Sequence, residues 1–321
     1  MEWEEFWSKL LKDNKIKSKI ENINEVDFEL YGEYKIEKIC HNIYDNYPQK
    51  KLYLEDVRQK LLCIIDNFPG VHLQISRVKD IESLLCKVVK NKHAHMLDDN
   101  NPYHDISDVN YDDIVTDLIG IRLIISYRGK WIDLHNKIIS QFPYAEDLEQ
   151  YKIYKYIPHN KEGKPLLAEI PKVYHAPGDD TSIYNDQNVE CCLKENGYRS
   201  VHYIVSFMNT YVEIQLRTIY DEAWSDCDHN YVYKKDYHES FSALKELSKI
   251  LSLLTNASND LGEMMQYIFD EQVLREKDGK YVVNLDNTLS FRDIFDKITN
   301  ASTLLEEFNN RIVEKRGDGH E

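Results

Sequence analysis

Two acidic residues, Asp117 and Glu213, stand in segments whose composition could support phosphoryl-transfer chemistry. Asp117 opens the stretch DLIGIR, and Mg²⁺ in proteins is commonly held by one or two carboxylates together with phosphate oxygens. Glu213 lies in YVEIQLRT, where it could be a second metal ligand or a base toward a hydroxyl. Strict strand alternation would put Asp117 and Arg122 on opposite faces. They share a site only if Asp117 precedes the regular strand or if Gly120 marks a bulge. Taken alone, Asp117 could instead form a structural pair with an arginine, and a solvent-exposed position is the better explanation of Glu213.

A local group of cations lies in the stretch SRVKDIESLLCKVVK, in a chain whose formal net charge is −16. Arg77 and Lys79 stand where a predicted strand passes into a predicted helix, and Lys87 follows two turns later. A helix N-terminus with added lysine and arginine suits a polyphosphate. On this stretch alone, a solvated helix face is the simpler interpretation.

The stretch KENGYRSVHYIV combines the turn pair Asn196-Gly197 with polar residues at the start of a predicted strand. Tyr198, Ser200 and His202 share strand parity and are expected to face one way. An aromatic ring beside cations could carry a nucleobase, and a surface cluster across strands is the alternative. The sequence contains neither a phosphate-binding GxxxxGK[ST] loop nor a protein-kinase signature, which excludes those two enzyme classes.

Hydrophobic periodicity predicts the elements that must position these residues. Helices are predicted over much of residues 1–68 and over residues 131–142, 219–232, 240–267 and 289–313. A further helix is predicted to begin after Asp80, which would be its N-cap. The predicted strands are 71–75, 118–126, 201–209 and 211–218, with the last two forming a hairpin, and a further hairpin is expected in EKDGKYVVNL. Residues 143–193 show little periodicity and are expected to form a long loop or insertion. The fold class is therefore α+β, with a mixed central sheet flanked by helices.

The organisation along the chain suggests three parts: a helical region at 1–70, a catalytic domain at 71–235, and a helical C-terminal extension at 236–321. The composition, with 42% hydrophobic and 30% charged residues, is typical of a globular protein. There is no signal peptide and no apolar run long enough to span a membrane, so we expect a cytoplasmic protein without a membrane partner. The strongly negative charge argues against nucleic acid, although a local basic patch would suffice to bind it.

The motifs, taken in order, resemble the RelA/SpoT alarmone synthetase domain over roughly residues 73–235. The shared features are RVK with a lysine ten residues after the arginine, DLIGIR, NGYRSVH, and EIQLRT followed by DEAW and DHNYVYKK. The size resembles a small alarmone synthetase, a class that includes toxic members. The resemblance implies a nucleotidyltransferase-like fold and a Mg²⁺-dependent GTP/GDP pyrophosphokinase. Such an enzyme passes the β,γ-pyrophosphate of ATP to the 3′-hydroxyl of GDP or GTP, giving ppGpp or pppGpp and AMP.

The resemblance also implies roles for the ATP side of the site. Arg77 and Arg122 would sandwich the adenine, which offers a reason for an arginine inside an apolar strand, because a planar guanidinium is suited to stacking. Lys79 and Lys87 would contact the ATP phosphates.

The resemblance assigns the metal and the acceptor in the same way. Asp117 would bind Mg²⁺, with Glu213 as second ligand or as base toward the acceptor 3′-hydroxyl. Tyr198 would stack on guanine. The remaining acceptor-side residues would be Lys194, Asn196, His202, Gln215 and Arg217.

The sequence departs from the family pattern in two places, of which the first is a mild change and the second bears on the acceptor. Ser76 stands where the family usually has glycine, and the segment between the second and third motifs is much longer than in compact synthetases. That segment contains Lys155, Lys161, Lys164 and Lys172, which would reshape the acceptor pocket. A different acceptor, an adenosine nucleotide or the 3′ end of tRNA, is therefore the leading alternative, with tRNA the less favoured of the two because of the net charge.

A third hypothesis makes the chain a partner-regulated sensor form of the synthetase, with residues 236–321 binding a partner or masking the site. These C-terminal helices carry an apolar stripe formed by Leu244, Leu247, Ile250, Leu251 and Leu254. The stripe would either build a homo-oligomer or pack back onto the domain, and the sequence leaves both open.

Overall fold

The computed structural model describes residues 2–31, 35–145, 163–185, 187–233, 241–270, 274–277, 280–283 and 291–317. The helices are α1 (Trp3–Leu10), α2 (Asn14–Tyr31), α3 (Ile36–Ile65), α4 (Ile81–His95), α5 (Tyr111–Ile114), α6 (Trp131–Gln141), α8 (Ile219–Asp228), α9 (Phe241–Asp270) and α10 (Phe291–Gly317). The strands are β1 (Val71–Val78), β2 (Ile119–Ile125), β3 (Leu166–Leu167), β4 (Lys172–His175), β5 (Glu190–Leu193), β6 (Ser200–Phe207), β7 (Thr210–Thr218), β8 (Leu274–Lys277) and β9 (Lys280–Val283). Short 3₁₀ turns span Pro102–Asp105, Arg128–Lys130 and Ser182–Tyr184, and a π turn at His229–Tyr233 follows α8.

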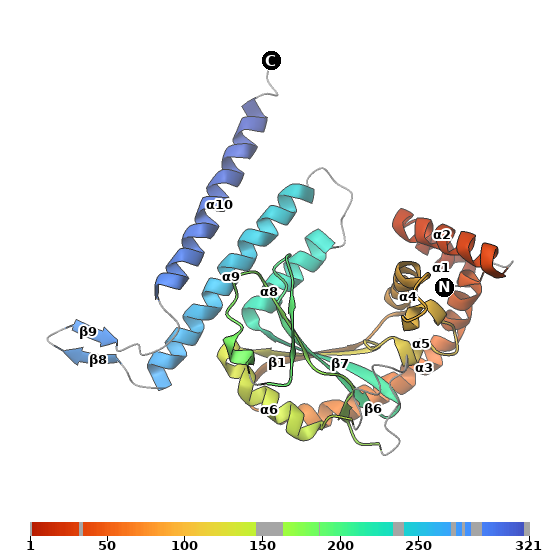
Figure 1. The fold of residues 1–321 in the computed structure, drawn as a ribbon, viewed down its shortest axis with the longest axis horizontal. Coiled ribbons are helices and arrows are strands. Elements are labelled where there is room, and N and C mark those ends of the chain that lie inside the picture. Colours follow the sequence, from red (N-terminus) through yellow and green to blue (C-terminus); the bar gives the residue numbers. More distant parts are fainter. Residues whose placement is uncertain are drawn as a thin grey trace.

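The central sheet is mixed and has the strand order β1-β2-β7-β6-β4-β5, with β3 paired to β6. β2 and β7 pair in parallel, as do β4 and β5, whereas β1–β2, β7–β6 and β6–β4 are antiparallel. In Figure 1, α3 and α6 lie along one side of the sheet, and α4 and α8 lie on the other side near its two ends. This arrangement confirms the predicted α+β class with a mixed sheet flanked by helices.

One face of the sheet is the hydrophobic core. Alternate residues of the two parallel strands, such as Ile121 of β2 and Ile214 of β7, are fully buried there. They belong to one cluster with Leu61 of α3 and with Trp131 and Ile138 of α6. The period-2 alternation of a strand then directs the intervening residues to the opposite face.

That opposite face carries the polar residues in register across the strands. Gly120 of β2 pairs with Arg77 of β1 and with Glu213 of β7. In the next row, Arg122 pairs with Gln215, and Gln215 pairs with His202 of β6. The strand register therefore places the predicted motifs side by side on one surface.

Most predicted elements form where periodicity placed them. The side chain of Asp80 accepts a hydrogen bond from the Ser83 amide at 2.8 Å, which confirms it as the N-cap of α4. The β6–β7 hairpin turns through Met208 and Asn209, both with positive φ (50° and 53°), as in a two-residue turn that matches the strand twist. The hairpin predicted in EKDGKYVVNL is the β8–β9 pair.

The segment 143–193 differs from the expected long loop. Residues 146–162 and Asp186 lie outside the described part, and so do Lys155 and Lys161. The rest contributes β3, β4 and β5 to the sheet. These strands escaped the periodicity analysis because each spans only two to four residues, which is too short to show an alternating pattern.

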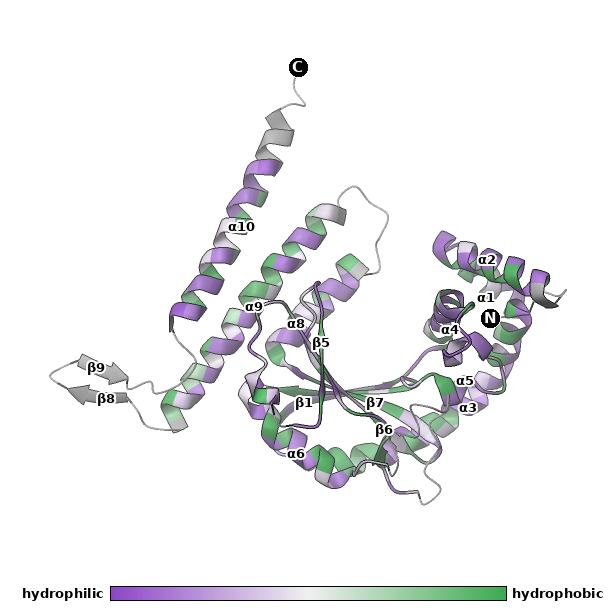
Figure 2. Cartoon of the chain, viewed as in Figure 1, coloured by the Kyte–Doolittle hydropathy of each residue, from purple (hydrophilic) through white to green (hydrophobic). Residues whose placement is uncertain are grey.

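The C-terminal extension forms two long helices, α9 and α10, which contact each other. Figure 2 shows hydrophilic and hydrophobic residues mixed along both helices. Several apolar side chains of α9 remain partly exposed, among them Leu247 and Leu254 at 38% and 39%. Ile250, by contrast, is buried, so part of the predicted stripe packs back onto the protein. In the described residues, no helix is both long enough and apolar enough to cross a membrane.

Candidate active site

Asp117 is held between two lysine ammonium groups at the entrance of β2. Lys79 Nζ lies 2.8 Å from Oδ2 and Lys87 Nζ lies 2.8 Å from Oδ1. Burial alone would raise the pKa of the Asp117 carboxyl, but Lys87 and Lys79 outweigh this and hold the pKa below its ordinary value. Asp117 precedes β2, which begins at Ile119, so the carboxylate can share a surface with Arg122 without a bulge. These three residues, Lys79, Lys87 and Asp117, are called the lysine cluster below.

The lysine cluster borders a cavity of about 250 Å³ on the polar face of the sheet. The cavity is lined by Ile75, Ser76, Arg77, Asp117, Gly120, Ile121, Arg122, Glu213 and Gln215. Gly120 lies beside Arg77 in this lining, and a Cβ atom at this position would meet Arg77 Cγ at 4.0 Å, an ordinary contact distance. Two arginines and two carboxylates from three strands therefore face one hollow of a size suited to part of a nucleotide.

Arg122, the arginine in the apolar strand, has an acidic partner on helix α8. Its Nη1 donates to Glu222 Oε1 at 2.7 Å. The other carboxylate oxygen of Glu222 accepts from Arg217 Nη1 at 2.8 Å. The ion pair accounts for the tolerance of a charge in β2.

A chain of hydrogen bonds runs from Glu213 to Glu222 through the residues predicted on the acceptor side. His202 Nδ1 lies 3.2 Å from Glu213 Oε1, and His202 Nε2 lies 2.8 Å from the Tyr198 hydroxyl. The hydroxyl also accepts from Arg217 Nη2 at 2.7 Å. With neutral histidine, the assignment that satisfies every group has Nδ1–H donating to Glu213 and the tyrosine hydroxyl donating to Nε2. These five residues, Tyr198, His202, Glu213, Arg217 and Glu222, are called the tyrosine network.

The tyrosine network explains the charge state of Glu213. Burial would raise the pKa of this carboxyl, but the hydrogen bond from His202 outweighs burial and lowers the pKa below its ordinary value. Gln215 Nε2 also donates to Glu213, and Gln215 Oε1 accepts from Arg217. Glu213 is therefore ionised at neutral pH.

The Tyr198 ring lies in a group of aromatic and cationic side chains. The Arg217 guanidinium carbon is 5.1 Å from its centroid. Tyr174 and Trp224 approach with centroids 5.7 and 6.4 Å away. Lys194 Nζ stands 4.8 Å from the Tyr174 centroid. These contacts hold the ring in place without a ligand, which suits a surface on which a base could stack.

Asn196 acts on the turn itself. Its side-chain oxygen accepts from the Tyr198 amide at 3.3 Å, and Gly197 takes φ +88°. The turn pair therefore sets the backbone direction at Tyr198, just before β6 begins.

The structure thus brings the predicted residues together in two adjoining groups. Glu213 belongs to both the cavity lining and the tyrosine network, and Gln215 lines the cavity and bonds Glu213 and Arg217 of that network. Lys194 and Asn196 border the turn rather than the cavity. Sequence reasoning missed Tyr174 and Glu222. Glu222 could have been found from its place in the DEAW motif that follows EIQLRT, whereas the four-residue strand that carries Tyr174 is too short to show an alternating pattern.

The donor set suits a metal that also takes substrate oxygens. Asp117 and Glu213 line the same cavity. Across the described residues, no group of three or more His, Cys, Asp or Glu side chains could hold a metal. Two carboxylates completed by phosphate oxygens is the set that Mg²⁺ prefers, whereas a structural zinc site would need more protein ligands.

The chain was compared with curated proteins and with solved structures. No curated protein matches it. Among solved structures, a GTP pyrophosphokinase family protein from Streptococcus pneumoniae is similar, with 18% identity and a TM-score of 0.39 over 74% of this chain and 93% of that one. Small alarmone synthetase 1 from Bacillus subtilis, bound to its product pppGpp, is similar at 19% identity and a TM-score of 0.38 over 73% and 96%. Small alarmone synthetase 2 from the same organism matches at 19% identity and a TM-score of 0.39 over 70% and 99%.

The family comparison covers the part of the chain that holds the site. The model described as a region found in RelA/SpoT proteins matches residues 76–238, just over half of the chain. This range includes the lysine cluster, the cavity-lining arginines and the tyrosine network, and it agrees with the predicted resemblance. The chain therefore belongs to the RelA/SpoT family.

Proposed function

We propose that this chain is a Mg²⁺-dependent pyrophosphokinase that transfers the β,γ-pyrophosphate of ATP to the 3′-hydroxyl of GDP or GTP. The products are AMP and ppGpp or pppGpp. Family membership agrees with the predicted enzyme class, a GTP/GDP pyrophosphokinase. The observation that carries the proposal is the convergence of the lysine cluster and Glu213 on one cavity that two arginines also line.

The cavity side would hold ATP. Arg77 and Arg122 lie on neighbouring strands facing the same hollow and would enclose the adenine. Lys79 and Lys87 are already paired with Asp117, so binding of ATP with its metal would let them turn toward the phosphates. Asp117 and Glu213 would hold the magnesium ion, which would neutralise phosphate charge during transfer.

Glu213 suits a ligand better than a general base. Its pKa is lowered by His202, so the carboxylate is ionised but only weakly basic at neutral pH. Its hydrogen bond from His202 also ties it to the acceptor side. We therefore assign Glu213 the task of holding the metal and orienting the acceptor 3′-hydroxyl.

The tyrosine network would receive the acceptor. Tyr198 offers an aromatic surface for guanine. Arg217 and Lys194 place positive charge close to the aromatic pair formed by Tyr198 and Tyr174. His202 and Gln215 complete the polar edge between the acceptor and Glu213. The predicted cytoplasmic location is part of this proposal, since the substrates are nucleotides.

The test is incubation of the purified protein with ATP labelled in its γ-phosphate and with GDP, GTP, ATP or tRNA in turn. We expect label in a guanosine product, AMP released in equal amount, and loss of transfer when magnesium is chelated. Label moving only to tRNA or to an adenosine nucleotide would overturn the acceptor assignment. Failure to form AMP with every acceptor would overturn the reaction.

A further inference from the structure

Helix α9 presents a buried polar stripe to the catalytic domain. Ser252, Asn256 and Asn259 follow at intervals of four and three residues and so lie on one helical face. All three are nearly or fully buried. Buried polar side chains persist only when their hydrogen bonds are made, so the contacts of this stripe identify what α9 holds.

The first contact is with the turn that carries Tyr198. Arg199 Nη1 donates to Ser252 Oγ at 2.8 Å, and Ser252 Oγ donates to the Gly197 carbonyl at 3.4 Å. A Cβ atom at Gly197 would lie 2.5 Å from Ser252 Oγ, closer than any normal contact. The turn is therefore seated directly on α9, through the residues on either side of Tyr198.

The second contact is with Asp179, from the segment between the second and third motifs. Arg199 donates two hydrogen bonds to its carboxylate, at 2.7 and 2.9 Å, and Asn256 Nδ2 donates a third at 3.3 Å. The side chains of Asp179 and Arg199 are only 4% and 7% exposed. Burial would raise the pKa of Asp179, but Arg199 holds it below its ordinary value, so the pair stays charged.

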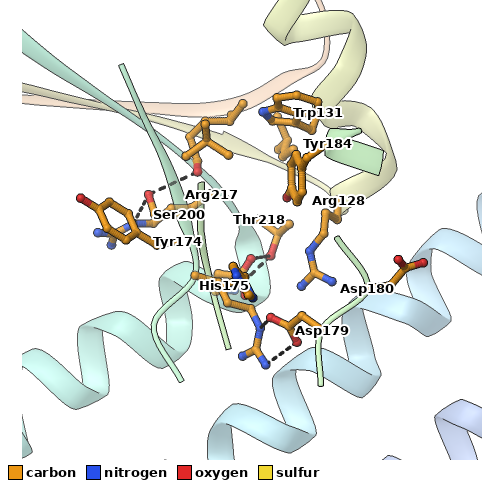
Figure 3. Close-up of a pocket in the computed structure, with 15 residues that line it drawn as sticks. Arg128, Trp131, Tyr174, His175, Asp179, Asp180, Tyr184, Ser200, Arg217 and Thr218 are labelled. Carbon is orange, nitrogen blue, oxygen red and sulfur yellow. Dashed lines mark hydrogen bonds and ion pairs between the residues drawn. The ribbon is translucent and has the colours of Figure 1, made fainter. Parts of the chain in front are cut away.

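The third contact is with Arg128, after β2. Its amide donates to Asn259 Oδ1 at 3.0 Å and its guanidinium to Asn256 Oδ1 at 3.1 Å. Figure 3 shows Arg128 and Asp179 beside a small cavity of about 30 Å³, which Arg217 also lines. Arg217 donates a hydrogen bond to the Tyr198 hydroxyl. The same cavity is therefore next to the residues that hold the backbone around Tyr198 and to the arginine that holds its side chain.

We propose that Ser252 and Asp179 are positioning residues for the acceptor, a proposal that rests on the proposed function. They fix Arg199 and with it the backbone of residues 197–199. This sets where Tyr198 presents its ring. Helix α9 is on this account part of the acceptor site, although it lies beyond the sequence motifs and touches no residue of the lysine cluster in the described contacts.

The experiment compares Ser252→Ala and Ser252→Val with Ser258→Ala. Ser258 lies on the same helix, is half-buried, and among the described contacts its hydroxyl donates to the carbonyl of Leu254 in its own helix, so it matches the chemical change without touching the turn. Ser252→Ala removes one hydrogen bond from a buried arginine and should raise the acceptor KM about 5-fold. Ser252→Val adds bulk against Gly197 and should raise it about 20-fold or more, since small displacements of a binding group are costly. The KM for ATP should stay near the wild-type value in both Ser252 variants, although their melting temperatures should fall because a buried hydrogen bond is lost. Ser258→Ala should leave both KM values and the melting temperature near those of wild type.

Hydrogen exchange of the amides at 196–200 gives a readout that does not depend on activity. Exchange should be faster in Ser252→Val than in wild type and unchanged in Ser258→Ala. Equal rises in both KM values, or unchanged exchange and unchanged acceptor KM in Ser252→Val, would overturn the positioning role. If wild-type protein transfers no pyrophosphate to any acceptor, the proposed function fails, and the exchange result alone decides whether α9 holds the turn.

Discussion

The lysine cluster and the tyrosine network lie on the same face of one sheet, but they are assembled differently. The lysine cluster comes from the residue that follows β1, from α4 and from the segment just before β2, and its two contacts are ion pairs to a single carboxylate. The tyrosine network draws on β6, β7 and α8, and its turn rests on α9 and on Asp179. One group depends on charge placed by neighbouring elements, and the other on packing between segments far apart in the chain.

Because of this difference, we expect substitutions in the two regions to affect the two substrates separately. Changes in the lysine cluster should affect ATP and the metal while leaving the acceptor pocket in place. Changes in the tyrosine network or beneath it should affect the acceptor and leave ATP binding in place. Glu213 belongs to both regions, so a substitution there should affect both substrates.

The largest effect is expected where the metal is held. Asp117→Asn should lower pyrophosphate transfer by about 1,000-fold or more, because a charged ligand to the metal is lost. Glu213→Gln should do the same. Initial rates of label transfer measure both, and circular dichroism checks that the fold is intact. Asp133→Asn, an identical change at an exposed position of α6, serves as control. A folded, fully active Asp117→Asn or Glu213→Gln protein would contradict the site assignment.

The next effect should be confined to the acceptor. Tyr198→Ala should raise the acceptor KM about 30-fold, in keeping with the loss of one stacked base contact, and leave the KM for ATP unchanged. Tyr198→Phe keeps the ring and removes the bonds to His202 and Arg217, so its effect should be smaller. Steady-state kinetics with each substrate varied in turn separate the two. If Tyr198→Ala changed both KM values alike, the two regions would not be independent.

A smaller effect, on ATP and not on the acceptor, should follow from removing the charge of Lys87 on α4. Lys87→Gln removes one of the two partners of Asp117 and should raise the Kd for ATP about 10-fold, with the acceptor KM unchanged. Isothermal titration with a non-hydrolysable ATP analogue measures this directly. Lys90→Gln makes the same change at an exposed position of the same helix and should bind the analogue normally. Equal losses in the two variants would show that Lys87 acts only through net charge.

The smallest effect concerns stability and lies on the opposite face of the sheet. His135 of α6 is buried, stacks on Trp131, and has Nδ1 3.0 Å from the Tyr203 hydroxyl. Burial lowers the pKa of His135 from 6.5 to about 4. Because the unfolded chain takes up this proton more readily, stability is present above the unfolded pKa and falls as pH decreases toward the folded pKa. Lowering pH from ~7.5 to ~6 should cost about 1 kcal/mol.

Urea unfolding at the two pH values tests this. His135→Phe should remove that part of the pH dependence while leaving both KM values at neutral pH unchanged. Asp117 and Glu213, whose pKa values are lowered, should stay ionised over the same range. A pH dependence identical in the variant would mean that another group is responsible.

The same contrast explains what could be predicted from sequence. Alternation within β2 and β7 indicates which residues face away from the core, so Arg122 and Gln215 could each be assigned to the polar face, but only the structure shows that these two strands are neighbours. The position of Asp117 before β2 was one of two alternatives, and the structure selects it. From the stretch around Lys87 alone, a solvated helix face was the simpler interpretation, because nothing in the local pattern shows that Asp117 approaches from another segment.

The support of Tyr198 could not be predicted. Arg199, Asp179 and Ser252 are separated by 20 and 53 residues from one another along the chain. Their sequence contexts read as a strand edge, an irregular segment and an amphipathic helix. Only the packing of α9 brings these three polar groups into one buried contact, and that information is tertiary.

The strand order carries a consequence for synthesis of the chain. β7 lies between β2 and β6 in space, yet it is the last strand of this sheet along the sequence. As the chain emerges from its N-terminus, β1 and β2 can pair early, and β4, β5 and β6 later, but these two halves have no hydrogen-bonded neighbour in common until residues 210–218 appear. Glu213 arrives on that joining strand. An unfinished chain therefore contains the ATP-side cations without the second carboxylate, and it should become able to react only when its sheet can close.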